Sequence, residues 1–248
     1  MIVFDIETGP RLDLPVEPPP PFDEDAVGAK LAERYVKDDT IQRHLDKARS
    51  EYLESLANWD ERQREQWPLD PALGCVVGWS VAHSTELSPQ AVIVGHDVAD
   101  EADAIRQLFQ LVDTSLKRGH HIAGHNILNF DLPFLMARAW CLGLRTPPGI
   151  GTWDRGFFRW NPLFIDTGKL WLMGRHPGMS SWSFATCAKA FGTSGKVAGV
   201  EGKDVWRLIR DGQYDAVRHY MLQDVVQPLA WIRRIVEFSG STYLAVEL

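Results

Sequence analysis

The first apolar segment of the chain, Ile2 to Thr8, is rich in β-branched and aromatic residues and is followed by Gly9-Pro10. This composition predicts a short strand that ends at the Gly-Pro pair. Asp5 and Glu7 alternate with apolar residues in this strand. The two carboxylates should therefore project from one face of the strand, roughly 6 to 7 Å apart along it.

The pattern changes after this strand. Leu14 to Phe22 contains Pro15 and the run Pro18 to Pro21, which predicts an extended, polyproline-like connector. From Asp23 to about Trp67 the chain is dense in charge and poor in glycine. Apolar residues recur there at helical spacing, at Leu31, Tyr35, Ile41, Leu45, Tyr52, Leu53 and Leu56. We interpret residues 23–67 as a helical insertion whose charges mostly form a solvated surface.

Strand and helix patterns alternate through the rest of the chain. Strands are predicted at Cys75 to Ala82, Ala91 to Gly95, His121 to Gly124 and Phe164 to Thr167, with a turn at Ser84 to Pro89. Helices are predicted at Glu101 to Lys117, Asp131 to Leu142, Ser181 to Phe191, Lys203 to Arg210 and Gln213 to Phe238, the last bent at Pro228. Interleaved strands and helices indicate an α/β fold.

Length and charge narrow the possible classes of protein. A chain of 248 residues can form one large domain with a full core, and we expect residues 1–248 to be a single domain with the insertion. The net charge of −7 argues against a broad polyanion-binding surface. Residues 1–150 carry a net charge of −10 and residues 151–248 a net charge of +3, so a cationic track beside an acidic site is compatible with the sequence.

The cysteines and the N-terminus indicate an intracellular protein. Cys75, Cys141 and Cys187 lie far apart without CxxC spacing, so neither a disulfide framework nor a zinc site is predicted. The first residues lack the basic and apolar regions of a signal peptide, and no apolar run reaches the length of a membrane span. We expect a cytoplasmic protein with no membrane association.

Two carboxylates on one strand face are a candidate metal site. Mg²⁺ and Mn²⁺ prefer carboxylate and phosphate oxygens, and two such ions can stabilise both the attacking and the leaving oxygen of a phosphodiester displacement. Asp5 and Glu7 alone would seldom hold two ions, and taken alone they are better explained as an ordinary edge-strand pair of acids. Further carboxylates are needed for a metal centre.

A third carboxylate follows the run Gly124-His125-Asn126. Gly124 and Asn126 suit a sharp exit from a strand into a loop, and Asp131 is then placed at a helix start, where an anion is favoured. An N-cap aspartate before an apolar helix face is the alternative interpretation. His125 is more consistent with a structural or hydrogen-bonding role than with metal ligation, because no second His or Cys stands at ligand spacing.

The last predicted helix carries Tyr220 and Asp224 four residues apart. They lie one turn apart on one face, so a phenol and a carboxylate could contact the same water. A free phenol has a pKa near 10 and is a poor base at neutral pH, so we expect Tyr220 to orient a nucleophilic water through its hydroxyl. Taken alone, Tyr220 is better explained as a residue of an amphipathic helix with its ring in the core.

Together these motifs resemble those of the DEDD 3′→5′ exonuclease superfamily, which has a ribonuclease-H-like (DnaQ-like) fold. Phe4 to Thr8 resembles the first motif, His125 to Asp131 the second, and Tyr220 to Asp224 the third in its tyrosine form. The segments Lys189 to Lys196, Gly202 to Leu208 and Gly212 to Tyr220 are similar to the approach to that motif in domains related to the proofreading domain of family-B DNA polymerases. The resemblance implies two Mg²⁺ or Mn²⁺ ions held by Asp5, Glu7, Asp131 and Asp224.

The third motif contains two candidates for the same role. His219 precedes Asp224 by five residues, as in the histidine subgroup, and Tyr220 precedes it by four, as in the tyrosine subgroup. On a regular helix Tyr220 is offset from Asp224 by about 40° and His219 by about 140°. The sequence therefore favours the tyrosine form.

Residues that accompany the motifs are the candidate substrate-binding residues. These are Thr8, His125, Asn126, Phe130 and Lys196. Single strands are held by aromatic stacking and by Lys and Arg, and six of the ten tryptophans fall in the cationic part of the chain. Most of these indoles should be core, so only the loops Gly151 to Trp160 and Lys196 to Lys203 are predicted to face substrate. Asp166 is interpreted as structural rather than catalytic.

These observations favour a metal-dependent 3′→5′ exonuclease acting on single-stranded or frayed DNA ends and releasing nucleoside 5′-monophosphates. An RNA exonuclease is the first alternative, because no motif reads the 2′-hydroxyl. A catalytically silent nucleic-acid-binding or polymerase-associated module is the second, and retention of all four carboxylates argues against it. The insertion could cover the site, bind a DNA polymerase or other replication or repair protein, or add stability.

Overall fold

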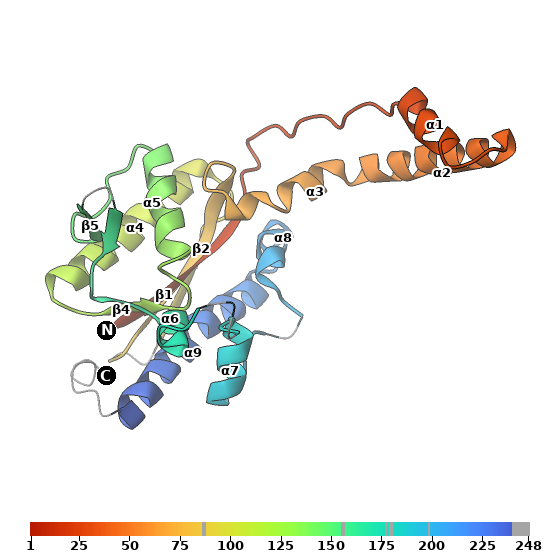
Figure 1. Ribbon diagram of the computed structural model, residues 1–248. Coiled ribbons are helices and arrows are strands. Elements are labelled where there is room, and N and C mark those ends of the chain that lie inside the picture. Colours follow the sequence, from red (N-terminus) through yellow and green to blue (C-terminus); the bar gives the residue numbers. More distant parts are fainter. Residues whose placement is uncertain (86–87, 155–156, 177, 179–180, 198, 240–248) are drawn as a thin grey trace. The chain divides into compact units, whose positions relative to one another are not determined.

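The computed structural model describes residues 1–239 except 86–87, 155–156, 177, 179–180 and 198 (Figure 1). Contacts divide the chain into two compact units, one formed by Met1–Arg11 with Trp67–Leu248 and the other by Leu12–Gln66. The second unit thus interrupts the first in sequence, between Arg11 and Trp67. The grouping of both units into one exonuclease domain stays a prediction.

A mixed five-stranded sheet forms the centre of the first unit. Its order is β3-β2-β1-β4-β7, with β1 antiparallel to β2 and parallel to β4. β3 is antiparallel to β2, and β7 is parallel to β4. The strands span Ile2–Pro10 (β1), Gly74–His83 (β2), Gln90–Ile93 (β3), Ile122–Gly124 (β4) and Phe164–Asp166 (β7). The predicted α/β class is confirmed.

The two faces of β1 lie in different cores. Ile2, Phe4 and Ile6 belong to a cluster that includes residues of α4 (Val98–Lys117) and α5 (Asp131–Cys141). Val3 packs instead with residues of α9 (Tyr214–Ser239). Because side chains alternate along a strand, Asp5 and Glu7 share the α9 face with Val3. The alternation that the sequence predicts therefore directs both carboxylates toward the last helix.

Helices cover both faces of this sheet, with α4 and α5 on one side and α9 on the other (Figure 1). Their bounds are Val98–Lys117 (α4), Asp131–Cys141 (α5), Thr167–Leu172 (α6), Phe184–Phe191 (α7), Val205–Arg210 (α8) and Tyr214–Ser239 (α9). A short 3₁₀ turn, Gly202–Asp204, precedes α8, and another spans Trp67–Leu69. None of the helices in the described ranges is long and apolar enough to cross a membrane.

Several boundaries differ from the sequence prediction. β1 continues through Gly9 to Pro10, which pairs with Gly74, so the Gly-Pro pair does not end the strand. The predicted loop Gly151 to Trp160 is instead a hairpin of β5 (Gly151–Asp154) and β6 (Phe157–Trp160). The helix predicted from Ser181 begins at Phe184, because Ser183 caps it. Residues 86–87 of the predicted turn, and 155–156 and 198 of the two predicted substrate loops, lie outside the described residues.

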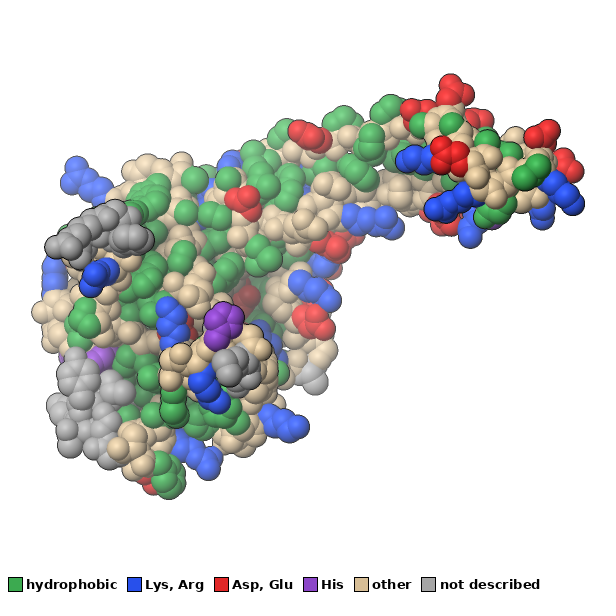
Figure 2. Space-filling model, viewed as in Figure 1, with side chains coloured by type: hydrophobic (Ala, Val, Ile, Leu, Met, Phe, Trp, Pro, Cys, Tyr) green, Lys and Arg blue, Asp and Glu red, His purple; other side chains and the backbone are tan. Residues whose placement is uncertain are grey.

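The unit Leu12–Gln66 contains three helices, Glu24–Ala32 (α1), Asp38–Ala57 (α2) and Trp59–Arg64 (α3). Neither α1 nor α2 has a buried residue. Tyr52 and Trp59 donate hydrogen bonds to the carbonyls of Pro20 and Glu17, at 3.0 and 2.8 Å, and so hold the proline-rich connector. With 14 acidic and 8 basic residues, the unit carries a net charge of −6, compared with −7 for the whole chain. Figure 2 shows acidic and basic side chains interspersed on its surface.

A fully buried ion pair fixes the helix that begins at Asp131. Arg138, two turns into α5, donates to both carboxylate oxygens of Glu101 on α4, at 2.9 and 2.6 Å. Glu101 also accepts from the backbone N–H of Val76, and Arg138 donates to the carbonyl of Pro71. These partners satisfy both buried charges, and removing either partner alone would leave the other uncompensated. The pair ties α4, α5 and the start of β2 together.

Candidate metal centre

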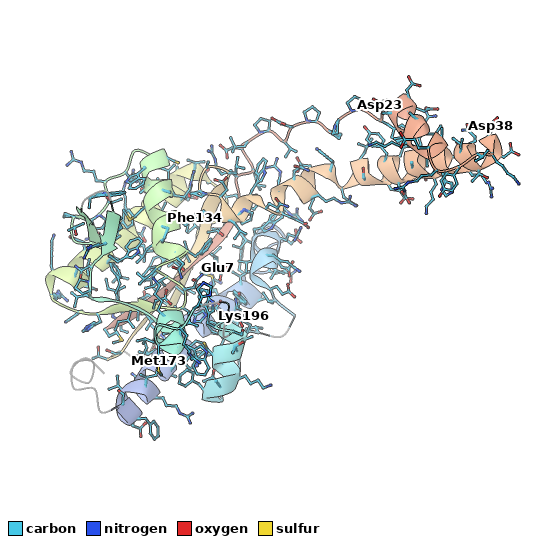
Figure 3. The ribbon with its side chains drawn as sticks, viewed as in Figure 1. Glu7, Asp23, Asp38, Phe134, Met173 and Lys196 are labelled. Atoms are coloured by element: carbon cyan, nitrogen blue, oxygen red, sulfur yellow. The ribbon has the colours of Figure 1, made fainter. Side chains whose placement is uncertain are left out.

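Three carboxylates from opposite ends of the chain meet at the α9 face of β1. Oxygens of Asp5, Glu7 and Asp224 lie within 4.8 Å of one another. The side chains of Glu7 and Asp224 are buried, and that of Asp5 is partly buried. Figure 3 labels Glu7 on β1 and Lys196, which lies in the connection between α7 and α8. The close group thus contains three of the four carboxylates that the sequence singled out.

The fourth carboxylate, Asp131, contacts the backbone of β1. It is 3% exposed at the first position of α5, and its Oδ1 accepts a hydrogen bond from the backbone N–H of Ile6 at 3.1 Å. Asp131 is not among the three carboxylates within 4.8 Å. Its charge nevertheless is the largest carboxylate contribution to the raised pKa of Asp5, so Asp131 borders the group.

The loop from β4 to Asp131 needs its glycine and its asparagine. A Cβ on Gly124 would lie 2.2 Å from Cγ2 of Ile127 and 2.6 Å from the carbonyl oxygen of Phe4. Asn126 has a φ of 65°, in the left-handed region that asparagine tolerates better than most residues. The sequence analysis predicted a sharp exit here, and both residues form one.

Asp166 organises the same loop from a neighbouring strand. Its 3% exposed carboxylate accepts backbone hydrogen bonds from Asn126 and Leu128 at 3.1 and 3.2 Å. It also accepts from the N–H groups of Gly168 and Lys169 at the start of α6. Four backbone donors on one carboxylate fit the structural role that the sequence suggested. They connect the end of β7 to the loop that carries Asp131.

Burial dominates the electrostatics of the four acids. Removal from water is the largest cause of a raised pKa for Asp5, Glu7, Asp131 and Asp224, because it disfavours the charged form. It raises the pKa of Asp131 to about 7. Mutual repulsion adds to this effect, since Asp224 is the main charge that raises the pKa of Glu7. A cation within the group would offset both the unfavourable burial of the charged carboxylates and the repulsion between them.

Tyr220 and Lys196 complete the polar surroundings of Asp224. Tyr220 is 1% exposed, and its hydroxyl oxygen accepts a hydrogen bond from Nζ of Lys196 at 2.5 Å. Nζ of Lys196 also lies 3.6 Å from Oδ2 of Asp224. Burial raises the pKa of Tyr220 above its usual value, so the phenol keeps its proton at neutral pH. His219, the alternative candidate, is exposed on the helix.

The other predicted substrate residues are distributed around the group. Thr8 is buried beside Glu7, where the pairing of β1 with β2 is irregular. The imidazole of His125 packs edge-on against Phe184 and Trp231. Its Nδ1 lies 3.0 Å from Oγ1 of Thr167. Burial lowers the pKa of His125 to about 4. Asn126 and Phe130 flank the loop before Asp131, with Phe130 packed on Phe134. Of the six C-terminal tryptophans, Trp206 and Trp231 are fully buried and Trp153 is 68% exposed.

The donor set fits hard divalent cations. All three close ligands are carboxylates, the type of ligand that Mg²⁺ and Mn²⁺ prefer. Oδ1 of Asp224 is buried and accepts no hydrogen bond from any residue in the described ranges. A buried carboxylate oxygen without a donor is costly, and coordination to a cation would satisfy it. The arrangement can therefore hold a metal ion next to a neutral phenol and a lysine.

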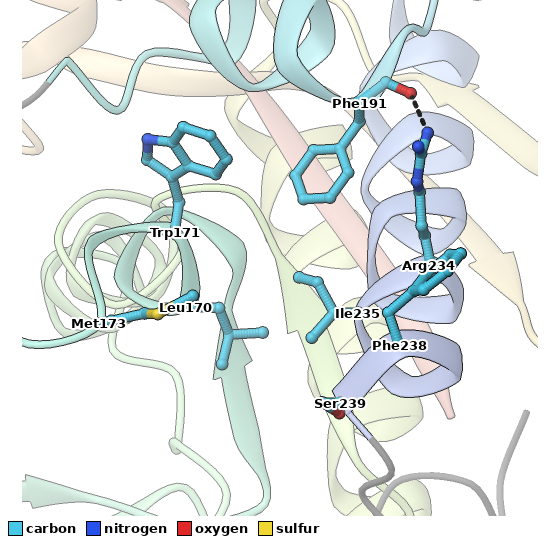
Figure 4. A pocket seen from close by; sticks show the side chains of 8 residues that line it. All are labelled: Leu170, Trp171, Met173, Phe191, Arg234, Ile235, Phe238 and Ser239. Atoms are coloured by element: carbon cyan, nitrogen blue, oxygen red, sulfur yellow. Dashed lines mark hydrogen bonds between the residues drawn. The ribbon is translucent and has the colours of Figure 1, made fainter.

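A hollow in the surface lies apart from the carboxylates. It has a volume of about 630 Å³ between α6, α7 and the end of α9 (Figure 4). Its walls are mainly apolar, and include Trp171, Phe191 and Phe238. The guanidinium of Arg234 at its edge donates to the carbonyl of Phe191 at 2.9 Å. Among the described residues, those that line this hollow include no carboxylate, so it does not extend the candidate metal centre.

Comparison with known proteins identifies related sequences and folds. Residues 69–243 match a family described as "Predicted 3'-5' exonuclease related to the exonuclease domain of PolB". Asp131, Lys196, Tyr220 and Asp224 lie inside the matched range, and Asp5 and Glu7 lie before it. No curated protein matches the chain.

The structure resembles that of the family B DNA polymerase from the hyperthermophilic archaeon Pyrobaculum calidifontis, with a TM-score of 0.54 and 18% sequence identity. The match covers 70% of this chain and 23% of the polymerase chain. At this level of identity the likeness concerns the fold. It agrees with the mixed five-stranded sheet flanked by helices.

Proposed function

Because the chain belongs to the family of predicted 3'-5' exonucleases related to the exonuclease domain of PolB, we propose that it hydrolyses the 3′-terminal phosphodiester bond of single-stranded or frayed DNA, using two divalent metal ions, Mg²⁺ or Mn²⁺. The products would be nucleoside 5′-monophosphates. The observation that carries the proposal is the group of Asp5, Glu7 and Asp224 within 4.8 Å, bordered by Asp131.

In the proposed site, Asp5, Glu7, Asp131 and Asp224 are the metal ligands. Bound metal ions would supply charge stabilisation for the attacking and leaving oxygens. Asp131 would bind in its deprotonated form, with the Ile6 N–H holding one of its oxygens in place. The burial that raises the pKa of these groups also excludes water, which strengthens the attraction of the carboxylates for a cation.

Tyr220 is proposed to position the attacking water. Its oxygen accepts a hydrogen bond from Lys196, and a hydrogen bond to Asp224 contributes to the raised pKa of Tyr220, so the phenol donates its proton toward the proposed metal ligands. With its pKa raised by burial, the phenol cannot take a proton from water near pH 7. An orienting role is therefore more consistent with the chemistry than a role as general base.

Lys196 is proposed to bind the substrate phosphate. Its side chain is 41% exposed, and its Nζ lies beside Asp224 and Tyr220. An ammonium next to the metal ligands can pair with an oxygen of the terminal phosphate. Thr8, His125, Asn126 and Phe130 are proposed as further substrate-binding residues, and the hairpin carrying exposed Trp153 as a surface for the single strand.

DNA is favoured over RNA by one comparison. A solved structure with a similar fold is a family B DNA polymerase. That relationship also supports a DNA polymerase, or another replication or repair protein, as the proposed protein partner. RNA remains the alternative substrate, because no residue of the site has been assigned to a 2′-hydroxyl.

Purified protein with Mn²⁺ or Mg²⁺ should shorten a 5′-labelled oligodeoxynucleotide from its 3′ end, one nucleotide at a time. Denaturing gels would show the ladder, and chromatography the nucleoside 5′-monophosphates. A matched RNA oligonucleotide distinguishes the two substrates, and EDTA should abolish both reactions. Intact 3′ ends on DNA and RNA in either metal would refute the exonuclease assignment.

The roles of Tyr220 and His219 can be separated by paired substitutions. Tyr220→Phe should lower turnover by roughly 10²-fold, because the buried phenyl ring stays while the orienting hydroxyl is lost. His219→Ala should change turnover by less than about twofold, because the imidazole is exposed and is offset from Asp224 by about 140° on a regular helix. Single-turnover rates with saturating Mn²⁺ measure both effects. The reverse ranking would assign the water-positioning role to His219.

A further inference from the structure

The loop that carries Lys196 has no regular secondary structure of its own. Residues 193–196 connect the end of α7 to the segment before α8, and Gly195 has a φ of 75°. Yet Nζ of Lys196 lies 2.5 Å from the Tyr220 oxygen and 3.6 Å from Oδ2 of Asp224. A lysine side chain has many rotamers, so holding its ammonium at such a place requires a fixed backbone. The structure contains a group that fixes it.

Gln227 on α9 binds both backbone groups of Gly195. Its Oε1 accepts from the N–H of Gly195 at 2.9 Å, and its Nε2 donates to the carbonyl of Gly195 at 2.6 Å. The side chain is 3% exposed and lies three residues after Asp224 on the same helix. A carboxamide satisfies a peptide N–H and a peptide C=O together in one orientation only, which determines the placement of its oxygen and nitrogen.

Two further contacts strengthen this attachment. Oγ1 of Thr193 donates to Oε1 of Gln227 at 2.8 Å and accepts from Nε1 of Trp231 at 3.0 Å. Gln227 and Trp231 lie one turn apart on α9, so one face of the helix binds both Thr193 and Gly195. That helix also carries Tyr220 and Asp224. The loop and two of the proposed active-site groups are thus attached to one rigid element.

We propose that Gln227 is a positioning residue that acts through Lys196. By holding the peptide groups of Gly195, it directs the next residue, Lys196, toward Asp224 and Tyr220, where the ammonium can pair with the terminal phosphate. The inference rests on the proposed function for the phosphate contact. The attachment of Gly195 to Gln227 does not depend on it. A purely structural glutamine would stabilise the fold without controlling the ammonium of Lys196.

Gln227→Met tests this role, because methionine preserves the length and approximate volume of the side chain and removes both hydrogen-bonding groups. We expect kcat/KM on a 5′-labelled oligothymidylate to fall by about tenfold, as it should in Lys196→Ala. In the Lys196→Ala background, Gln227→Met should then change kcat/KM by less than about twofold, since coupled residues are not additive. Effects that multiply in the double variant would overturn the proposal.

A second readout does not require activity. Lys196 should be acetylated several times faster in Gln227→Met than in wild type, measured on metal-free protein by peptide mass spectrometry. The exposed Lys189 and Lys203 serve as internal controls, and their rates should not change. An unchanged acetylation rate for Lys196 would contradict the proposal. If wild type leaves 3′ ends intact, the exonuclease assignment fails, while this comparison still tests the attachment.

Two further variants distinguish a specific role of Gln227 from general destabilisation of the fold. Gln227→Glu keeps an acceptor for the Gly195 N–H but faces the Gly195 carbonyl with a carboxylate oxygen. We expect the acetylation rate of Lys196 and kcat/KM both to be intermediate between those of wild type and Gln227→Met. Val226→Met, at an adjacent position that is 38% exposed, is the matched control and should behave as wild type. Equal effects of Val226→Met and Gln227→Met would refute a specific role for Gln227.

Discussion

Asp5→Asn should lower turnover by about 10³-fold and raise the thermal stability of the metal-free protein. Asparagine keeps the shape of the side chain but removes one of the three charges that meet within 4.8 Å. Loss of a charged ligand weakens metal binding and the charge stabilisation that the metal supplies. The same change relieves repulsion, because burial and the charges of Asp131, Glu7 and Asp224 all raise the pKa of Asp5. Substitution of a functional group that destabilises the folded state typically raises stability and lowers activity.

Single-turnover rates in Mn²⁺ and thermal unfolding in EDTA measure the two effects of Asp5→Asn. Asp215→Asn is the matched control, because Asp215 is fully exposed near the start of α9 and should change neither quantity. Full activity of Asp5→Asn would exclude Asp5 as a metal ligand. A fall in metal-free stability, without loss of activity, would mean that the carboxylate is structural.

The stability of the metal-free protein should fall as the pH rises from about 4 to 8. The folded-state pKa of the four acids lies above its ordinary value, chiefly because of burial. The folded state therefore binds protons more tightly than the unfolded chain. The resulting stabilisation is complete below the unfolded pKa near 4 and is lost as the pH passes the folded pKa, which is about 7 for Asp131. We expect a loss on the order of a few kcal/mol across this window.

Divalent metal should reverse this loss. Carboxylates bind metal in their deprotonated form, so the stabilisation by Mn²⁺ should be small at pH 5 and largest at pH 8. Thermal unfolding from pH 5 to 8, with EDTA or with Mn²⁺, would measure it. Asp5→Asn should weaken the pH dependence of stability both in EDTA and in Mn²⁺, since it removes one titrating group and reduces the repulsion on the other carboxylates. Metal-free stability that is independent of pH, with equal stabilisation by Mn²⁺ throughout, would contradict a buried cluster of ionisable ligands.

Most of the secondary structure follows from local patterns. β1, β2, α4, α5 and α9 lie close to their predicted ranges because each has a strong hydrophobic period or a clear cap. The hairpin of β5 and β6 was wrongly predicted as a loop. Its strands are four residues each and pair with one another rather than with the main sheet, so no long alternating pattern marks them. Helix α6 was missed because it is short and contains Gly168, which lowers its helix propensity, whereas α8 is equally short but has no glycine.

The sequence by itself determined which residues could form a metal centre. Strand alternation places Asp5 and Glu7 on one face, and the helical period places Tyr220 and Asp224 on another, both being local geometric constraints. Their meeting depends on the packing of α9 against β1, which brings together residues more than 200 positions apart in the chain. The same packing decided that Lys196 contacts Tyr220 and that Gln227 binds Gly195. Such contacts depend on the burial of whole faces and on the paths of connecting loops, which no local period encodes.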